Sequence, residues 1–132
     1  MKISASITNA YNKNEIMLST DDHSKAITIP SQRNGYGSSV NGGELLMLAL
    51  ATCYCNDIYR EAAKRNIQVS QVEVEVIGDF GADGEPGNNF RYRPVVRSNA
   101  SPEQLKQLIE ETDRIAEIHN TLRQGLQVKL LL

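Results

Sequence analysis

The sequence has few cysteines and histidines, and this shortage excludes several classes of protein. It contains two cysteines and two histidines among 132 residues. Two thiols separated by a single residue cannot form the disulfide framework of a small secreted domain. These four side chains also lack the spacing of metal ligands, so no metal and no cofactor is expected. The first residues alternate between apolar and polar types and contain no secretory signal, so we expect reduced thiols in the cytoplasm.

The sequence also lacks a strong charge imbalance and a long apolar run. Its formal net charge is -2, and 23% of its residues are charged. This balance gives no basic surface for nucleic acid or for an anionic membrane. Asn56 and Asp57 interrupt the longest apolar stretch before it could span a bilayer. The length favours one domain over residues 1–132.

The longest apolar stretch lies within residues 40–66, which we predict to form the central helix of the fold. Most of residues 45–52 are strong helix formers, and the stretch is apolar or nearly so around the whole helix. A helix that is apolar on every side must be covered on every side. A chain of this length has little else to cover it, so the segment predicts an obligate homodimer.

The two cysteines of this helix fall on different faces. One face is mainly apolar and contains Leu48, Ala51, Cys55, Ile58, Tyr59 and Ala62. Another contains Cys53, Asn56, Asp57 and Arg60. This pattern predicts that Cys55 lies in the core and that Cys53 belongs to the functional site.

Strand patterns surround the central helix. Alternating apolar residues predict three strands before it, near 3–8, 15–19 and 25–29, and two after it, near 69–76 and 90–93. Ser101 and Gln104 form a predicted capping box, which opens a second helix extending to Gly125. Residues 126–132 form a predicted last strand. Strands in runs, interrupted by two helices, indicate the α+β class.

Five parts of the sequence together resemble the OsmC/Ohr family, the osmotically inducible and organic hydroperoxide resistance proteins. They are NGGELL at 41–46, Cys53, KRNI at 64–67, VEV at 72–74 and HNTL at 119–122. The resemblance implies an intertwined homodimer with buried central helices and a site at the subunit interface. It also implies an enzyme of the oxidative stress response, which reduces hydroperoxides with two cysteines. An arginine and a glutamate activate the first thiol, and an external dithiol such as lipoamide recycles the disulfide.

The sequence departs from this family pattern at three catalytic positions. The resolving cysteine falls on Ala116, and the catalytic glutamate falls on Gly43, next to Glu44. The hairpin turn that carries the activating arginine offers only Lys13 here. The two-cysteine mechanism is therefore not available, and an external thiol would have to complete the cycle.

Each candidate thiol has two interpretations. Cys53 is either the thiol that attacks the peroxide or an inert, half-buried cysteine. Arg60 lies on its face and could favour the thiolate, whereas Asp57 would oppose it. Cys55 is either a core residue or a resolving thiol for the Cys53 of a second subunit.

Two further residues are candidates for supporting roles. Arg33, in the glycine-rich loop at 31–43, is either a substitute for the missing arginine or a solvated loop residue. His119 is either a base at the site or a structural histidine. The leading hypothesis is thiol-dependent reduction of hydroperoxides at Cys53. The alternative is a dimeric module that has lost this activity and binds a small apolar ligand.

Overall fold

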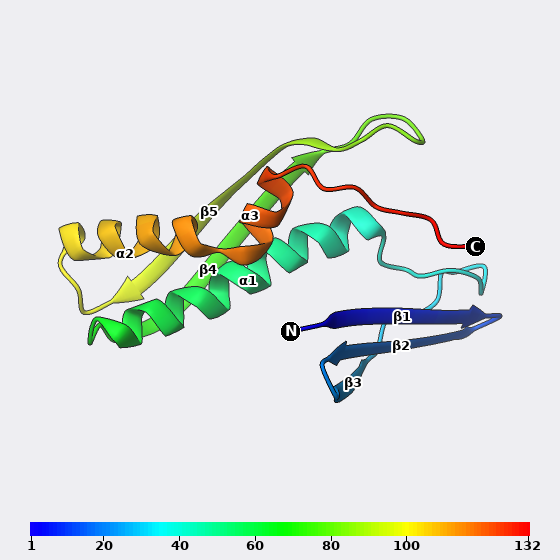
Figure 1. The fold of residues 1–132 in the computed structure, drawn as a ribbon, viewed down its shortest axis with the longest axis horizontal. Coiled ribbons are helices and arrows are strands. Elements are labelled where there is room, and N and C mark those ends of the chain that lie inside the picture. The colour runs from blue at the N-terminus through cyan, green and yellow to red at the C-terminus, as the bar shows by residue number, and fades with distance from the viewer. The chain divides into compact units, whose positions relative to one another are not determined.

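The computed structural model describes residues 1–132, and the chain divides into two compact units, 1–44 and 45–132. In order, the elements are β1 (Ile3–Ala10), β2 (Lys13–Thr20), β3 (His23–Ile27), α1 (Gly42–Lys64), β4 (Val69–Asp79), β5 (Asn88–Ser98), α2 (Pro102–Ile115) and α3 (Glu117–Arg123) (Figure 1). The predicted α+β class is confirmed. That the chain forms a single domain stays a prediction. No helix combines the length and the apolar character needed to cross a membrane.

The first unit is a three-stranded antiparallel sheet in the order β1-β2-β3. Asn12 and Asp21 occupy its two hairpin turns with positive φ angles of 52° and 49°, a conformation that Asn and Asp adopt more readily than other non-glycine residues. The loop after β3 returns to the first turn, where the amide of Asn12 donates to the carbonyl of Gly35 over 2.6 Å. Gly35 has a φ of 90°, and a Cβ there would also meet the ring of Tyr11, so this position favours glycine.

Helix α1 starts with a reciprocal capping pair. The amide of Glu44 donates to the side chain of Asn41 over 2.8 Å, and the amide of Asn41 donates to the carboxylate of Glu44 over 3.0 Å. Two of the amides that a helix start leaves free are therefore satisfied by side chains.

The second unit combines the antiparallel hairpin β4-β5 with three helices (Figure 1). Its core lies where α1, α2 and the hairpin meet and consists of Tyr54, Ile58, Ala62, Val96, Leu108 and Ala116. The capping box of Ser101 and Gln104 at the start of α2 is present as predicted. Pro94 lies within β5 opposite Val74, in a two-stranded sheet where both strands are edges.

The single helix predicted up to Gly125 is wrong, because the chain breaks at Ala116. This residue is extended, with φ -66° and ψ 110°, and separates α2 from α3. Carbonyls left free by the break accept hydrogen bonds from α3: Asn120 donates to the carbonyl of Arg114 over 3.0 Å, and Arg123 to that of Asp113 over 3.3 Å. Side chains from the next helix thus compensate the lost backbone bonds.

The predicted last strand at 126–132 is also wrong for the single chain. These residues form no regular element. The apolar side chains of this segment are exposed; they are Leu126, Val128, Leu130, Leu131 and Leu132. Apolar residues alone do not make a strand, which also needs a neighbour to pair with.

Candidate functional site

Cys53 lies in the middle of α1, on the side that packs against the core of the second unit. Its thiol donates to the carboxylate of Asp57, one turn further along the helix, with 3.7 Å between Sγ and Oδ2. The backbone amides of Glu117 and Ile118, at the start of α3, also approach the sulfur as hydrogen-bond donors. The break at Ala116 therefore brings free amides of a second helix to the thiol.

The surroundings of Cys53 keep its thiol protonated. Burial is the main cause that raises its pKa, and the negative charge of Asp57 raises it further. The amides of Ile118 and Glu117 lower the pKa, but less than the other causes raise it. A thiol whose pKa is raised in this way needs a neighbouring group that accepts its proton as it reacts.

Activation of Cys53 by Arg60 stays a prediction, and the geometry does not favour it. The guanidinium of Arg60 pairs with Asp57 instead, with 3.0 Å between Nη1 and Oδ1. The positive charge of Arg60 therefore pairs with the carboxylate of Asp57. Arg60 does not contribute to the shifted pKa of the Cys53 thiol. Arg60 fixes the orientation of the group that faces the sulfur.

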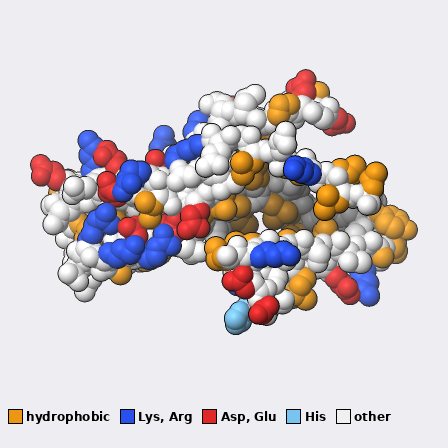
Figure 2. Space-filling model, in the orientation of Figure 1, with side chains coloured by type: hydrophobic (Ala, Val, Ile, Leu, Met, Phe, Trp, Pro, Cys, Tyr) orange, Lys and Arg blue, Asp and Glu red, His pale blue; other side chains and the backbone are white.

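Asp57 and Glu61 are both buried, with 5% and 7% of their surfaces exposed. Glu61 lies one turn beyond Asp57 and pairs with Lys64 at 2.8 Å, and with Arg60 and Arg65 at 3.5 Å each. The hydrogen bond from Lys64 is the main cause of its lowered pKa. Basic and acidic side chains are intermixed over the end of the unit where α1 ends and α2 begins (Figure 2). Close cations thus compensate the buried carboxylates.

The predicted faces of α1 are reversed in part. Cys55, expected in the core, borders a shallow hollow together with Leu48, Ala51, Thr52, Asn56 and Val74. Leu48 and Tyr59, expected to be buried, are 59% and 43% exposed. The buried side of α1 consists of Leu50, Tyr54, Asp57, Ile58, Glu61 and Ala62. Two carboxylates within this stripe made it appear polar in the sequence.

The other predicted residues have different surroundings. Ala116, where the resemblance places a resolving cysteine, is fully buried in the core. The carboxylate of Glu44 caps the start of α1. Arg33 lies exposed in the loop of the first unit. Neither Arg33 nor Glu44 belongs to the unit that holds Cys53.

His119 lies on α3 in the same unit as Cys53 and is buried, with 5% of its surface exposed. Its ring packs edge-on against Tyr92 at 4.6 Å and against Tyr54 at 6.0 Å between centroids. Burial and the charge of Arg123 lower its pKa, although Asp113 and Asp57 oppose this shift. The imidazole is therefore neutral at pH 7.

A polar network of Tyr92, Asp113 and Arg123 lies beside His119, and it was not predicted from the sequence. The hydroxyl of Tyr92 donates to Asp113 over 2.5 Å, and Arg123 pairs with the same carboxylate oxygen at 2.7 Å. Burial opposes ionisation of Asp113, but these two hydrogen bonds lower its pKa overall. The break at Ala116 is what brings Arg123 back to α2, and neither residue type nor spacing signalled that break.

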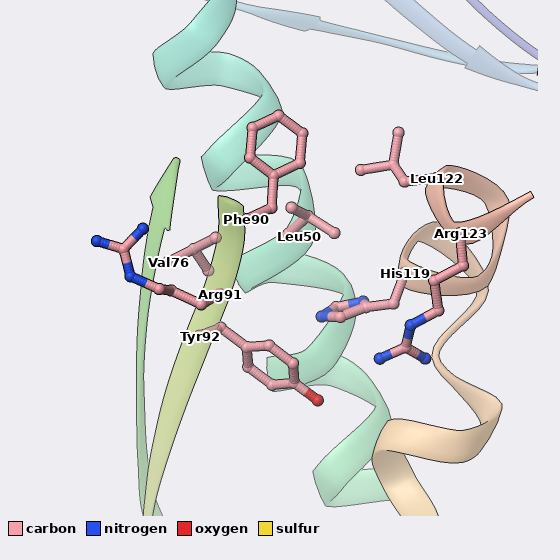
Figure 3. A pocket seen from close by; sticks show the side chains of 8 residues that line it. All are labelled: Leu50, Val76, Phe90, Arg91, Tyr92, His119, Leu122 and Arg123. Atoms are coloured by element: carbon pink, nitrogen blue, oxygen red, sulfur yellow. The ribbon is translucent and has the colours of Figure 1, made fainter. Parts of the chain in front are cut away.

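A pocket of about 430 Å³ opens in front of His119. Its apolar walls are Leu50, Val76, Phe90 and Leu122, and its polar groups are Arg91, Tyr92, His119 and Arg123. The imidazole extends from α3 into the space bordered by Leu50 and Tyr92 (Figure 3). All these residues belong to the second unit. No group of three or more His, Cys, Asp or Glu side chains is arranged to hold a metal ion.

Several solved structures have a fold similar to that of this chain. A solved OsmC-like protein from Mycoplasma pneumoniae is 18% identical, with a TM-score of 0.64 over 95% of this chain and 87% of that one. The organic hydroperoxide resistance protein OhrB of Bacillus subtilis is 16% identical, with a TM-score of 0.57 over 98% of this chain and 96% of that one. A putative organic hydroperoxide resistance protein from Vibrio cholerae, with captopril bound in one of its active sites, is 17% identical, with a TM-score of 0.56 over 98% and 89%.

These structures share the fold at low sequence identity, so they bear on architecture alone. No curated protein matches the sequence closely enough to count as a relative. The sequence model of the family described as OsmC-like protein matches residues 35–131, which include all of the second unit except the last residue. The chain therefore belongs to the family of OsmC-like proteins.

Proposed function

We propose that the protein reduces organic hydroperoxides at Cys53 and that an external thiol completes the cycle. The observation that carries this proposal is the hydrogen bond from the Cys53 thiol to the buried carboxylate of Asp57. A thiol whose pKa is raised reacts only if a neighbouring group takes its proton, and Asp57 lies where such a base must lie. Family membership and the hydroperoxide resistance proteins among the structural neighbours point to the same substrate class.

The first step oxidises the thiol and reduces the peroxide. The sulfur attacks the outer oxygen of the hydroperoxide, so that an S–O bond forms as the O–O bond breaks. The thiol proton passes through Asp57 to the departing oxygen, which leaves as an alcohol, and Cys53 becomes a sulfenic acid. The amides of Glu117 and Ile118 stabilise negative charge that develops on the sulfur.

The second stage returns Cys53 to its thiol. Ala116 has no sulfur with which to form a disulfide. An external thiol condenses with the sulfenic acid, releasing water and forming a mixed disulfide, and a second thiol then frees Cys53. Such thiols are abundant in the cytoplasm, which is where we place the protein.

The proposal includes a homodimer. Leu45 and Leu48 lie on the outer side of α1 with 37% and 59% of their surfaces exposed. Apolar side chains grouped in this way on a helix favour association with a second copy.

The decisive experiment follows peroxide consumption by wild type, Cys53→Ser and Cys55→Ser. Cumene hydroperoxide is the substrate, and dithiothreitol or reduced lipoamide is the reductant. We expect consumption to fall to the uncatalysed rate in Cys53→Ser and to persist in Cys55→Ser. Activity that survives in Cys53→Ser would falsify the proposal. The dimeric binding module would then be the better description, and the His119 pocket favours it independently.

A further inference from the structure

His119 has two polar atoms that no group of the protein satisfies. Both imidazole nitrogens are buried, and neither has a hydrogen-bond partner. A neutral imidazole carries one N–H donor and one acceptor nitrogen. Buried polar atoms in native proteins almost always have partners, so an orphaned pair on a side chain that lines a pocket indicates a ligand for one of them. A polar head that can both accept and donate a hydrogen bond can serve the nitrogen it reaches in either tautomer.

The charges around the pocket are already neutralised. Arg123 pairs with Asp113 at 2.7 Å and also donates to Asn120 over 2.9 Å. Arg91 pairs with Asp79 at 3.4 Å and donates to the carbonyl of Asn89 over 2.8 Å. Its side chain also extends away from His119 (Figure 3). An anion would have to displace carboxylates of the protein, and a cation would find none free.

The remaining surface of the pocket is apolar. Leu50, Val76, Phe90 and Leu122 surround the entrance to His119, and the volume of about 430 Å³ lies within the range of small-molecule sites. Apolar walls with one polar pair at the base fit a molecule with a single polar head and a hydrocarbon body.

We propose that the His119 pocket binds a small uncharged organic molecule whose polar head is a hydroxyl group. The hydroxyl either donates to the unprotonated ring nitrogen or accepts from the ring N–H, whichever of the two His119 presents to the pocket, while the hydrocarbon body packs against Leu50, Phe90 and Leu122. Cys53 does not line this pocket. The proposal therefore does not rest on peroxide reduction.

The test uses probes that differ only in the polar head. Cumyl alcohol, cumyl methyl ether and phenylacetate are titrated into the full-length protein, and the imidazole nitrogen chemical shifts of His119 are followed by NMR. The hydroxyl can donate, the ether cannot, and phenylacetate carries a charge. We expect cumyl alcohol to shift the His119 signals and to bind at least about tenfold more tightly than the ether or the anion.

Variants of His119 locate the interaction. His119→Phe removes both nitrogens, whereas His119→Gln keeps one donor and one acceptor. We expect His119→Phe to abolish the preference of the pocket for the alcohol over the ether, and His119→Gln to keep most of it. If His119→Phe does not fold, the His119 chemical shifts of the wild-type protein during the alcohol and ether titrations still test the proposal. Unchanged His119 signals at saturating alcohol, or equal binding of alcohol and ether, would overturn the proposal.

One further arm separates this site from the proposed peroxidase. Cys53→Ser should bind cumyl alcohol as wild type does, because its side chain lies outside the pocket. Cumene hydroperoxide, which has the same body and a hydroperoxide head, is titrated into the same variant. Binding of the alcohol at least as tightly as the hydroperoxide supports a hydroxyl site. Binding of the hydroperoxide alone overturns it in favour of a substrate pocket.

Discussion

The two cysteines of α1 are separated by one residue and are both half-buried, yet their neighbours differ. Cys53 packs against the core, faces the carboxylate of Asp57 and is approached by two amides of α3. Cys55 borders a shallow hollow on the apolar outer side of the helix, next to Leu48 and Ala51. The Cys53 side of α1 is thus covered by other elements of the same chain, whereas the Cys55 side remains exposed. Chemistry is expected on the first side, and association on the second.

Of the substitutions that test this difference between the two sides of α1, we expect Asp57→Asn to have the largest effect on the reactivity of Cys53. Removing the carboxylate takes away a cause that raises the pKa of Cys53, so alkylation of this thiol should become faster at neutral pH. Peroxide reduction should nevertheless slow by about a hundredfold or more, because the base is lost. The measurements are iodoacetamide alkylation of Cys53, located by peptide mass spectrometry, and peroxide consumption by the same sample.

Glu61→Gln is the matched control for that experiment. It makes the same chemical change in a buried, ion-paired carboxylate one turn away, which does not contact the thiol. This variant should lose stability and keep its peroxide rate. If alkylation and peroxide reduction both accelerate in Asp57→Asn, Asp57 only restrains the thiol and is not its base.

The next largest effect concerns the open side of the helix. Leu48→Asp places a charge within the proposed dimer interface, where it would be buried without a partner. Losing the apolar contact alone costs about 1.5–3 kcal/mol per leucine, and the contact occurs in both subunits. We expect association to weaken more than about tenfold, as measured by analytical ultracentrifugation.

Gln107→Asp adds the same charge on the exposed side of α2 and should leave association unchanged. A folded wild-type monomer at micromolar concentration would contradict the proposed dimer directly. Equal association of Leu48→Asp and wild type would move the interface away from this side of α1.

The difference between the two sides also explains what the sequence could and could not predict. Features determined by neighbouring residues were predictable, such as the capping box of Ser101 and Gln104 and the hairpin turns at Asn12 and Asp21. Their signals are short-range, since each needs only a few consecutive residues. Membership of the family followed from motifs of the same local kind.

Features that depend on distant partners were not predictable. The burial of Asp57 and Glu61 requires cations placed by the folded helix, and hydropathy assigns carboxylates to water. The break at Ala116 falls on the best helix former and is supported by Asn120 and Arg123 from the next helix. Cys53 could be selected from the sequence, but its contacts could not, because they come from α3.

A smaller effect concerns stability and pH on the closed side. His119 has a pKa lowered by burial and by Arg123, with Asp113 and Asp57 opposing. Below about pH 6.5 the unfolded chain takes up a proton at this histidine before the folded chain does. Stability is therefore lost as pH falls through that value, by about 1.4 kcal/mol for each unit of pKa difference. Thermal unfolding followed from pH 7.5 to pH 5.5 should show this loss.

His119→Gln should remove this component of the pH dependence, and His23→Gln should not, because His23 is exposed at the start of β3. Asp113 and Glu61, whose pKa values are lowered, also lose their contribution as pH falls, but in a more acidic range. Identical pH profiles for His119→Gln and wild type would mean that the folded protein protonates His119 as readily as the unfolded chain.

The smallest expected effect is the absence of a reaction between the two cysteines. Both are free thiols, and side chains two residues apart on a helix point to different sides, out of reach of disulfide geometry. A bond between them would require α1 to unwind at Tyr54. That residue is fully buried, and its hydroxyl donates to the carbonyl of Ile109 over 2.9 Å. Mild oxidation with diamide should therefore give no bond from Cys53 to Cys55 within one chain, as peptide mass spectrometry would report. Detecting that bond in protein that retains its helical circular dichroism would show that the two sides of α1 exchange, and the distinction between the two thiols would no longer hold.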